Sequence, residues 1–235
     1  MKKFKAIVPA LAMLLVSAVL LGTSTFAWFS MNQSVSATGM QVTAKSESVW
    51  LQIANEDGAS SDNGKTATAK TATGKIFPAK WNGDGATGEK WQTAVAAEPG
   101  ASAKVGEYTD VADGQKNDYR LFNTFKISVK ENTATSASNL KVTTCKVTGT
   151  SEFTDAIGVV VVCGTNVQTI LAKGKTPGTS FDIAAAEVLA ATVTSTPVEV
   201  KVYVYIDGDN EKVYTDNMTA ANVAGINVEL TFGVD

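Results

Sequence analysis

The chain contains no histidine among its 235 residues. A sequence without histidine cannot form a Ser-His-Asp or Cys-His nucleophile system, and it cannot supply the imidazole ligands of an HExxH-type zinc site. No other nucleophile, base or metal-ligand constellation is recognisable, and no spacing singles out a pair of carboxylates for glycoside hydrolysis. The sequence therefore predicts a protein that is not an enzyme and that carries no cofactor.

The chain also lacks an excess of positive charge. Lysine and arginine together number 20 against 23 aspartate and glutamate residues, which gives a formal net charge of −3. A mildly acidic chain has no basic surface that could follow a phosphate backbone. We therefore expect no nucleic-acid partner.

Cysteine is scarce, because Cys145 and Cys163 are the only two. They lie on two predicted strands that are close in sequence, with 17 residues between them. A disulfide across these strands would close a loop for which the chain-entropy estimate is about 3 kcal/mol. The alternative is a pair of small buried thiols in neighbouring core strands, and the sequence leaves both open.

Long hydrophobic runs are absent except at the N-terminus. Three lysines lie within the first five residues, residues 6–21 are almost entirely apolar, and small residues precede Trp28. This order is typical of a secretory signal peptide, and it predicts cleavage between Ala27 and Trp28. Removing residues 1–27 leaves 208 residues with 17 basic and 23 acidic side chains. The alternative is an uncleaved membrane anchor, because the apolar run is just long enough to cross a bilayer.

The residues around the cleavage site carry a family resemblance. Residues 25–44 read TFAWFSMNQSVSATGMQVTA. The matching positions at the junction and in the strand that follows are Thr25, Phe26, Ala27, Phe29, Ala37, Gly39, Met40 and Val42. This run resembles the start of the TasA and camelysin-type proteins of Gram-positive bacteria. The resemblance implies removal of the signal by a SipW-type signal peptidase and a secreted, jelly-roll-like β-sandwich that assembles into biofilm matrix fibres.

The remainder of the chain is organised by apolar residues at alternate positions. This alternation predicts strands over residues 48–54, 119–130, 140–147, 198–206 and 226–234. The run 157–163 is apolar on both faces and predicts a strand that is covered on both sides, and 167–171 is expected to extend it beyond a turn. Residues 181–191 have the preference of a short connecting helix. We therefore expect an all-β protein, an antiparallel β-sandwich of jelly-roll type with long loops and an N-terminal signal helix.

The expected division of the chain is a signal peptide at 1–27, an N-terminal strand and assembly segment at 28–47, and a sandwich domain at 48–235. Within the sandwich domain, residues 55–118 are rich in Gly, Ser, Thr, Asp and Asn. Such a composition predicts a long insertion of solvated loops and short strand pieces. The tryptophan side chains of this insertion are expected to pack at the edge of the sandwich.

Two short motifs are candidate ligand sites. Residues 83–88 read GDGATG, which has the G-x-G-x-x-G spacing of dinucleotide-binding turns. That motif needs a strand before it and a helix after it, and neither is predicted here, so we interpret it as a flexible loop. Asp207, Asp209 and Glu211 alternate in a turn, as calcium ligands often do, but the glycine and the bidentate glutamate of an EF-hand are missing.

These observations favour a secreted structural subunit of extracellular fibres or pilus-like filaments. The proposed assembly strand contains the apolar residues Trp28, Phe29, Met31 and Val35, and the segment carries no charge before Lys45. Such a strand could be added to the open edge of a second copy, which makes the partner a homo-oligomer. Other matrix or cell-wall components are further expected partners. The alternative is a surface adhesive module that presents residues 55–118.

Overall fold

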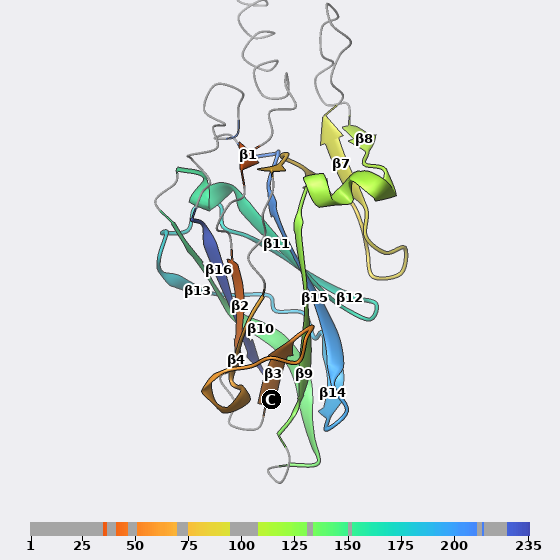
Figure 1. The fold of residues 1–235 in the computed structure, drawn as a ribbon, viewed down its shortest axis with the longest axis vertical. Helices are drawn as coiled ribbons and strands as arrows, with labels where there is room; N and C mark the ends of the chain where they lie inside the picture. Colours follow the sequence, from red (N-terminus) through yellow and green to blue (C-terminus); the bar gives the residue numbers. More distant parts are fainter. Residues whose placement is uncertain are drawn as a thin grey trace, which may run out of the picture.

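The structure of the protein is a computed structural model that describes residues 35–36, 41–46, 51–69, 75–94, 108–130, 134–149, 152–210, 213 and 225–235. In this part of the chain the sheets are almost entirely antiparallel, and two of them pack face to face as a sandwich (Figure 1). The expected all-β antiparallel sandwich is confirmed. The predicted signal helix, Ala27, Trp28, Phe29, Met31 and Glu211 lie outside the described residues. Within them, no helix has the length and apolar character needed to span a membrane.

The first sheet of the sandwich is six-stranded and contains the N-terminal and C-terminal strands side by side. In spatial order it consists of β13 (Ser180–Asp182), β10 (Ser136–Thr148), β16 (Asn227–Gly233), β2 (Gln41–Ser46) and β4 (Thr66–Thr68), with β14 (Ala190–Thr194) also paired to β10. The β2–β16 pair is parallel, with Gln41 opposite Asn227, whereas the other pairs are antiparallel. The chain from Gln41 to Ser46 is therefore a strand of its own subunit's sheet.

The second sheet is five-stranded and antiparallel throughout. Its order is β12 (Asn166–Leu171), β11 (Ile157–Cys163), β15 (Val198–Ile206), β9 (Leu121–Val129) and β3 (Leu51–Asn55). Two short 3-10 helices, η1 (Asp62–Gly64) and η3 (Glu152–Ala156), lie in connections of the sandwich. β15 is therefore the central strand of this sheet and has neighbours on both sides.

The alternating apolar residues face the space between the two sheets, because successive side chains of a strand point to opposite faces. In β9 the alternate residues Phe125, Ile127 and Val129 are buried, as are Val228, Leu230 and Phe232 in β16. β11 is buried on both faces over most of its length, and β12 follows it as a hairpin. The strand predictions for these segments are confirmed.

In β10 the alternation changes phase, which the sequence prediction missed. Leu140 and Val142 are buried, and so are Cys145 and Val147, although two residues rather than one lie between the two pairs. The register against β16 shifts between Val142 and Thr144, so Thr143 is an extra residue in a β-bulge. One inserted residue changes which side chains point inward, so apolar residues on both sides of the bulge can face the core.

The prediction of a helix over residues 181–191 is wrong. This segment contains the end of β13, two turns and the start of β14, both of which pair with β10. Leu189 is buried, and its N–H donates to the carbonyl oxygen of Leu140 at 2.7 Å. Pairing to a long neighbouring strand and burial of one leucine outweigh the weak helix preference of an alanine-rich stretch.

Residues 55–69 are also more structured than a solvated loop. β4 pairs with β2, and Ala67 and Ala69 are buried in the main core. The amide of Asn55 donates to the carbonyl oxygen of Thr68 at 3.4 Å, which links the end of β3 to the end of β4. The last part of this stretch is therefore a strand with core residues and not a solvated loop.

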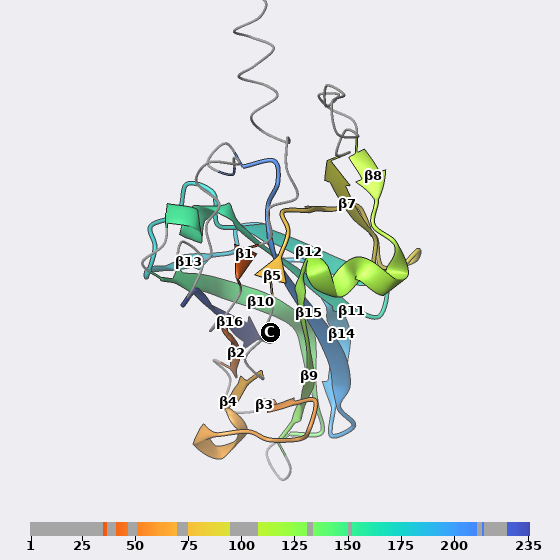
Figure 2. The same cartoon turned by 45° about the horizontal axis from the view of Figure 1, so that its top comes forward.

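Residues 75–94 and 108–119 form a third layer, which we call the arm. It contains a three-stranded sheet of β6 (Lys80–Trp81), β7 (Trp91–Ala94) and β8 (Tyr108–Asp110), and the 3-10 helix η2 (Asp113–Asp118). The arm begins with β5 (Lys75–Ile76), which pairs with β1 (Val35–Ser36) in a separate two-stranded sheet. The arm lies against the outer face of the second sheet (Figure 2). Trp81 and Trp91 thus pack over the middle of that sheet, and the prediction that they sit at its edge is wrong.

The two cysteines are free, so the disulfide alternative does not hold in this structure. Cys145 lies on β10 of the first sheet and Cys163 on β11 of the second, and both thiols are buried. Burial raises the pKa of the Cys145 thiol to about 12, and it also raises the pKa of the Cys163 thiol. Because only a thiolate is strongly nucleophilic, these residues act as small core side chains.

Candidate functional site

The most distinctive feature of the described chain is an aromatic cluster between the arm and β15. Val202 and Val204 of β15 face the sandwich core, so the residues between and after them, Tyr203 and Tyr205, face outward. An outward face normally carries polar residues, but here both tyrosines are at least 96% buried. The arm covers them.

The rings of this cluster meet at distances that favour aromatic packing. Trp91 contacts Tyr205 edge-on, with ring centroids 5.0 Å apart, and contacts Tyr203 at 6.1 Å. Trp81 stacks on Tyr203 at 5.7 Å and meets Trp91 edge-on at 5.1 Å. Aromatic pairs of this kind contribute about 0.5–1.5 kcal/mol beyond the area that they bury. The cluster therefore attaches the arm firmly to the second sheet.

Gly158 makes room for this arrangement. It lies on β11 directly opposite Tyr205, and a Cβ atom at this position would come within 2.3 Å of the Tyr205 ring. The tyrosine ring thus lies across the bare backbone of the neighbouring strand. Any side chain at position 158 would push Tyr205 towards Trp91.

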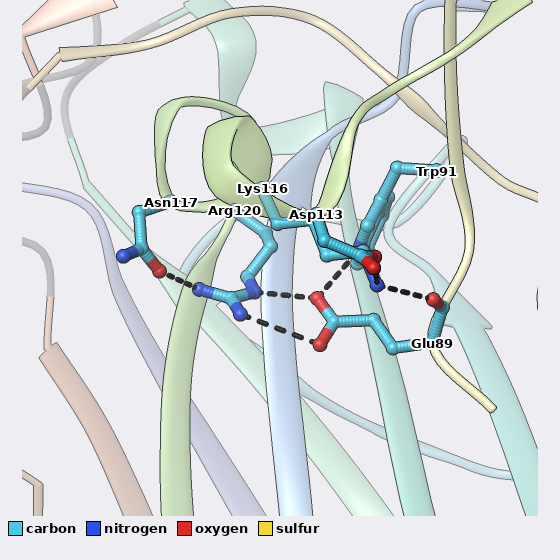
Figure 3. A network of polar contacts seen from close by, with 6 residues as sticks. All are labelled: Glu89, Trp91, Asp113, Lys116, Asn117 and Arg120. Carbon is cyan, nitrogen blue, oxygen red and sulfur yellow. Dashed lines mark hydrogen bonds and ion pairs between the residues drawn. The ribbon is translucent and has the colours of Figure 1, made fainter.

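A buried ion pair fixes the arm beside the cluster (Figure 3). The Glu89 carboxylate accepts hydrogen bonds from Arg120 Nε at 2.7 Å and from the Trp91 indole N–H at 2.7 Å. Lys116 Nζ donates to the Glu89 carbonyl oxygen at 2.6 Å, and a second Arg120 nitrogen donates to the side chain of Asn117. Arg120 precedes β9, so this network joins the loop before β7 to the second sheet.

Arg120 also lies over two aromatic rings. Its guanidinium carbon is 5.1 Å from the Phe122 ring centroid and 5.7 Å from that of Tyr203. Burial, together with the nearby Glu89 carboxylate, raises the pKa of Tyr203 to about 12. Tyr203 therefore stays neutral under physiological conditions and serves as a packing residue.

The GDGATG motif forms a turn that is packed against the second sheet. One carboxylate oxygen of Asp84 accepts the backbone N–H groups of Ala86 and Thr87, and these bonds lower the pKa of Asp84. A Cβ atom on Gly85 would lie 1.7 Å from the carbonyl oxygen of Thr165, in the turn between β11 and β12. Glycine is thus required for close contact between backbones. The strand β7 follows the motif, so the helix that a dinucleotide site needs is absent there.

The acidic turn after β15 holds its carboxylates in other interactions. Asp207 is buried, which raises its pKa, and its carboxylate accepts the N–H of Asp209 at 3.1 Å. Burial alone would raise the pKa of Asp209, but hydrogen bonds from Tyr108 and Lys80 outweigh it and lower the pKa. The Lys80 ammonium is 2.9 Å from the Asp209 carboxylate. Across the described residues, no three acidic or cysteine side chains are placed to hold a metal ion together.

We therefore expect the thermal midpoint to be the same with and without a chelator such as EDTA, because Lys80 occupies the place of a cation beside Asp209. The Asp209→Asn variant should lower stability by about 1 kcal/mol, since it loses the ion pair and weakens the hydrogen bond from Tyr108. Calorimetry of both proteins with and without EDTA checks this. A midpoint that falls on chelation in the wild type but not in the variant would show a bound metal.

Two hollows lie on either side of Trp81. The first, of about 360 Å³, is lined by Lys80, Trp81, Thr169, Leu171, Lys173, Tyr205, Asp207 and Asp209. The second, of about 260 Å³, is lined by Trp81, Asp84, Gly85, Gly88, Glu89, Val162, Gly164, Lys201 and Tyr203. The sequence analysis did not find this site. The signal for it was the pair of tyrosines on the outward face of β15.

Comparisons with protein-family models, with curated proteins and with solved structures find no match to this chain.

Proposed function

We propose that the protein is a secreted structural subunit of extracellular matrix fibres, which assembles when a strand from one copy is added to a sheet of the next. The observation that carries this proposal is the direction of β2. It runs parallel to β16, with Gln41 opposite Asn227 at the start of that strand. β2 thus begins at the end of the sandwich opposite to the C-terminus (Figure 1).

This polarity suits head-to-tail assembly. A subunit that extends a segment from one end and receives a segment at the other makes a heterologous contact, and repetition of such a contact gives an open filament. The segment before β2 contains Trp28, Phe29 and Met31, which are unfavourable in water, and it has no charged residue. Backbone hydrogen bonds would provide affinity and the alternate apolar side chains would provide specificity.

The structure changes one detail of the proposed assembly strand. Val35 and Ser36 form β1 and pair with Ile76 and Lys75 of the same chain. We therefore limit the donated strand to residues 28–34, with β1 as its attachment to its own subunit. Export with cleavage before Trp28 remains part of the proposal, because a signal peptide on residue 28 would block insertion of this end.

Filament formation by the mature chain that begins at Trp28 tests the proposal. A variant with serine in place of Trp28, Phe29 and Met31 should raise the critical concentration for assembly by at least about a thousand-fold, since each apolar side chain contributes about 1.5–3 kcal/mol when buried. The matched control replaces the neighbouring polar residues Ser30, Asn32 and Gln33 with alanine and should still form filaments. Electron microscopy and sedimentation measure both.

The serine variant should keep the melting behaviour of the monomer, because its changes lie before the described sandwich. Filaments of unchanged appearance and critical concentration from this variant would overturn the role of residues 28–34. Failure of the wild-type mature chain to form any filament would overturn the proposed function.

A further inference from the structure

The two hollows beside Trp81 have the character of a ligand site that fibre assembly does not use. Their lining residues come from the arm, from β11, β12 and the turns after them, and from β15 and the turn after it. Trp81 lines both hollows, so the two share one aromatic side chain. Concave sites with an aromatic side chain and several polar groups are the usual form of small-ligand sites.

The indole of Trp81 is held in a fixed orientation. It stacks on Tyr203 with an angle of 29° between the rings, and it meets Trp91 at 73°. Both partners are buried and are themselves held by Glu89 and by the strand β15. A ring held in this way loses little conformational entropy when a ligand stacks against it.

The polar lining has both signs of charge in each hollow. The first contains Lys80 and Lys173 together with Asp207 and Asp209. The second contains Asp84 and Glu89 together with Lys201. A polyanion or a polycation would meet like charges in either space, at a cost in binding energy. A neutral ligand with many hydroxyl groups can instead donate to the carboxylates and accept from the ammonium groups.

An apolar edge completes the site. Leu171, at the end of β12, is 43% exposed and lines the first hollow with Thr169. The C–H face of a sugar ring is apolar, whereas its hydroxyl groups are polar and lie around the edge. A surface that offers an aromatic face, an exposed leucine and charged groups of both signs matches these properties together.

We propose that the two hollows are one binding site for a neutral oligosaccharide. One sugar ring stacks against Trp81, and the neighbouring rings occupy the hollows, where their hydroxyl groups bond to Lys173 and Asp207 on one side and to Asp84 and Lys201 on the other. The proposal does not depend on assembly, because it uses only side chains of one subunit.

Binding is tested on the mature protein with the Trp28, Phe29 and Met31 serine changes, so that the outcome is independent of filaments. The probes are maltohexaose, cellohexaose and chitohexaose, each followed by calorimetry and by the indole N–H signals in NMR spectra. At least one should bind and shift the Trp81 signal. Trp81→Ala should weaken this binding about tenfold, as expected for loss of a stacking interaction.

Further variants separate binding from folding. Lys173→Ala and Leu171→Ser change side chains at the rim of the first hollow and should each weaken binding without unfolding the arm. Phe122→Ala is the matched control, because Phe122 also stacks on Tyr203 but lines neither hollow. Absence of binding by all three hexasaccharides, binding that these rim variants leave unchanged, or binding of a mixed hexapeptide pool in their place would overturn the proposal.

Discussion

Replacing Trp91 with alanine should detach the arm from the second sheet and lower the stability of the docked state by about 3–5 kcal/mol. Trp91 is 1% exposed and contacts three other aromatic rings of the cluster. Its removal leaves a cavity above β15, and it also takes one hydrogen-bond donor from the buried Glu89 carboxylate. Near-ultraviolet circular dichroism should report the loss of aromatic packing.

The sandwich itself should remain folded in this variant. The cluster around Trp91 is separate from the main core between the two sheets, to which it contributes no buried residue. Hydrogen exchange should therefore stay slow in β9 and β16 while it becomes fast in β7 and β8. Phe122→Ala is a control, since Phe122 is 40% exposed and its loss should cost only about 1 kcal/mol. Unfolding of the whole chain by Trp91→Ala, or no effect on the arm, would contradict this view of two cores.

Replacing Gly158 with alanine should destabilise the protein by about 1–3 kcal/mol although it adds only one methyl group. The new Cβ would lie 2.3 Å from the Tyr205 ring, and that ring is confined by Trp91 on its other side. Relief of the overlap requires movement of the ring or of the arm. For a chain of this size we expect the thermal midpoint to fall by about 2–4 °C per kcal/mol.

Gly114→Ala provides the control for Gly158→Ala. Gly114 lies in η2, and a Cβ atom there would meet no other atom within 4 Å. The free energy of unfolding of the Gly114→Ala variant should stay within about 0.5 kcal/mol of the wild-type value. Equal midpoints for Gly158→Ala and the wild type would mean that Tyr205 is free to move, and that the cluster does not hold the arm.

The sandwich strands could be predicted from the sequence because each buries one face in a single core. In β15, in β16 and in β9 from Phe125 onward every second residue is apolar, and the period of two follows directly from the geometry of a strand. The change in the alternation of buried residues along β10 was not predicted, because the bulge at Thr143 changes which residues face inward. Nothing in the local composition distinguishes an extra residue from a polar position.

The arm and the site beside it were missed for a different reason. Residues 75–94 and 108–119 have few apolar positions, and these are too far apart to give a period. The arm that they form is held by Tyr203 and Tyr205, more than 80 positions later in the chain. Propensity and periodicity are local properties, so they do not reveal a layer that is held by contacts with another strand. Two tyrosines in place of polar residues on an outward face were the one available sign.

The parallel pair of β2 and β16 also constrains how the chain reaches its native state. β2 has only the three-residue β4 as its other neighbour, so it gains most of its backbone bonds from β16. A ladder between strands so distant in the sequence requires closure of a long loop, and folding dominated by such contacts is slow. Because β2 is synthesised long before β16, it stays without its main partner until β16 has been made, and this sheet is completed late in folding.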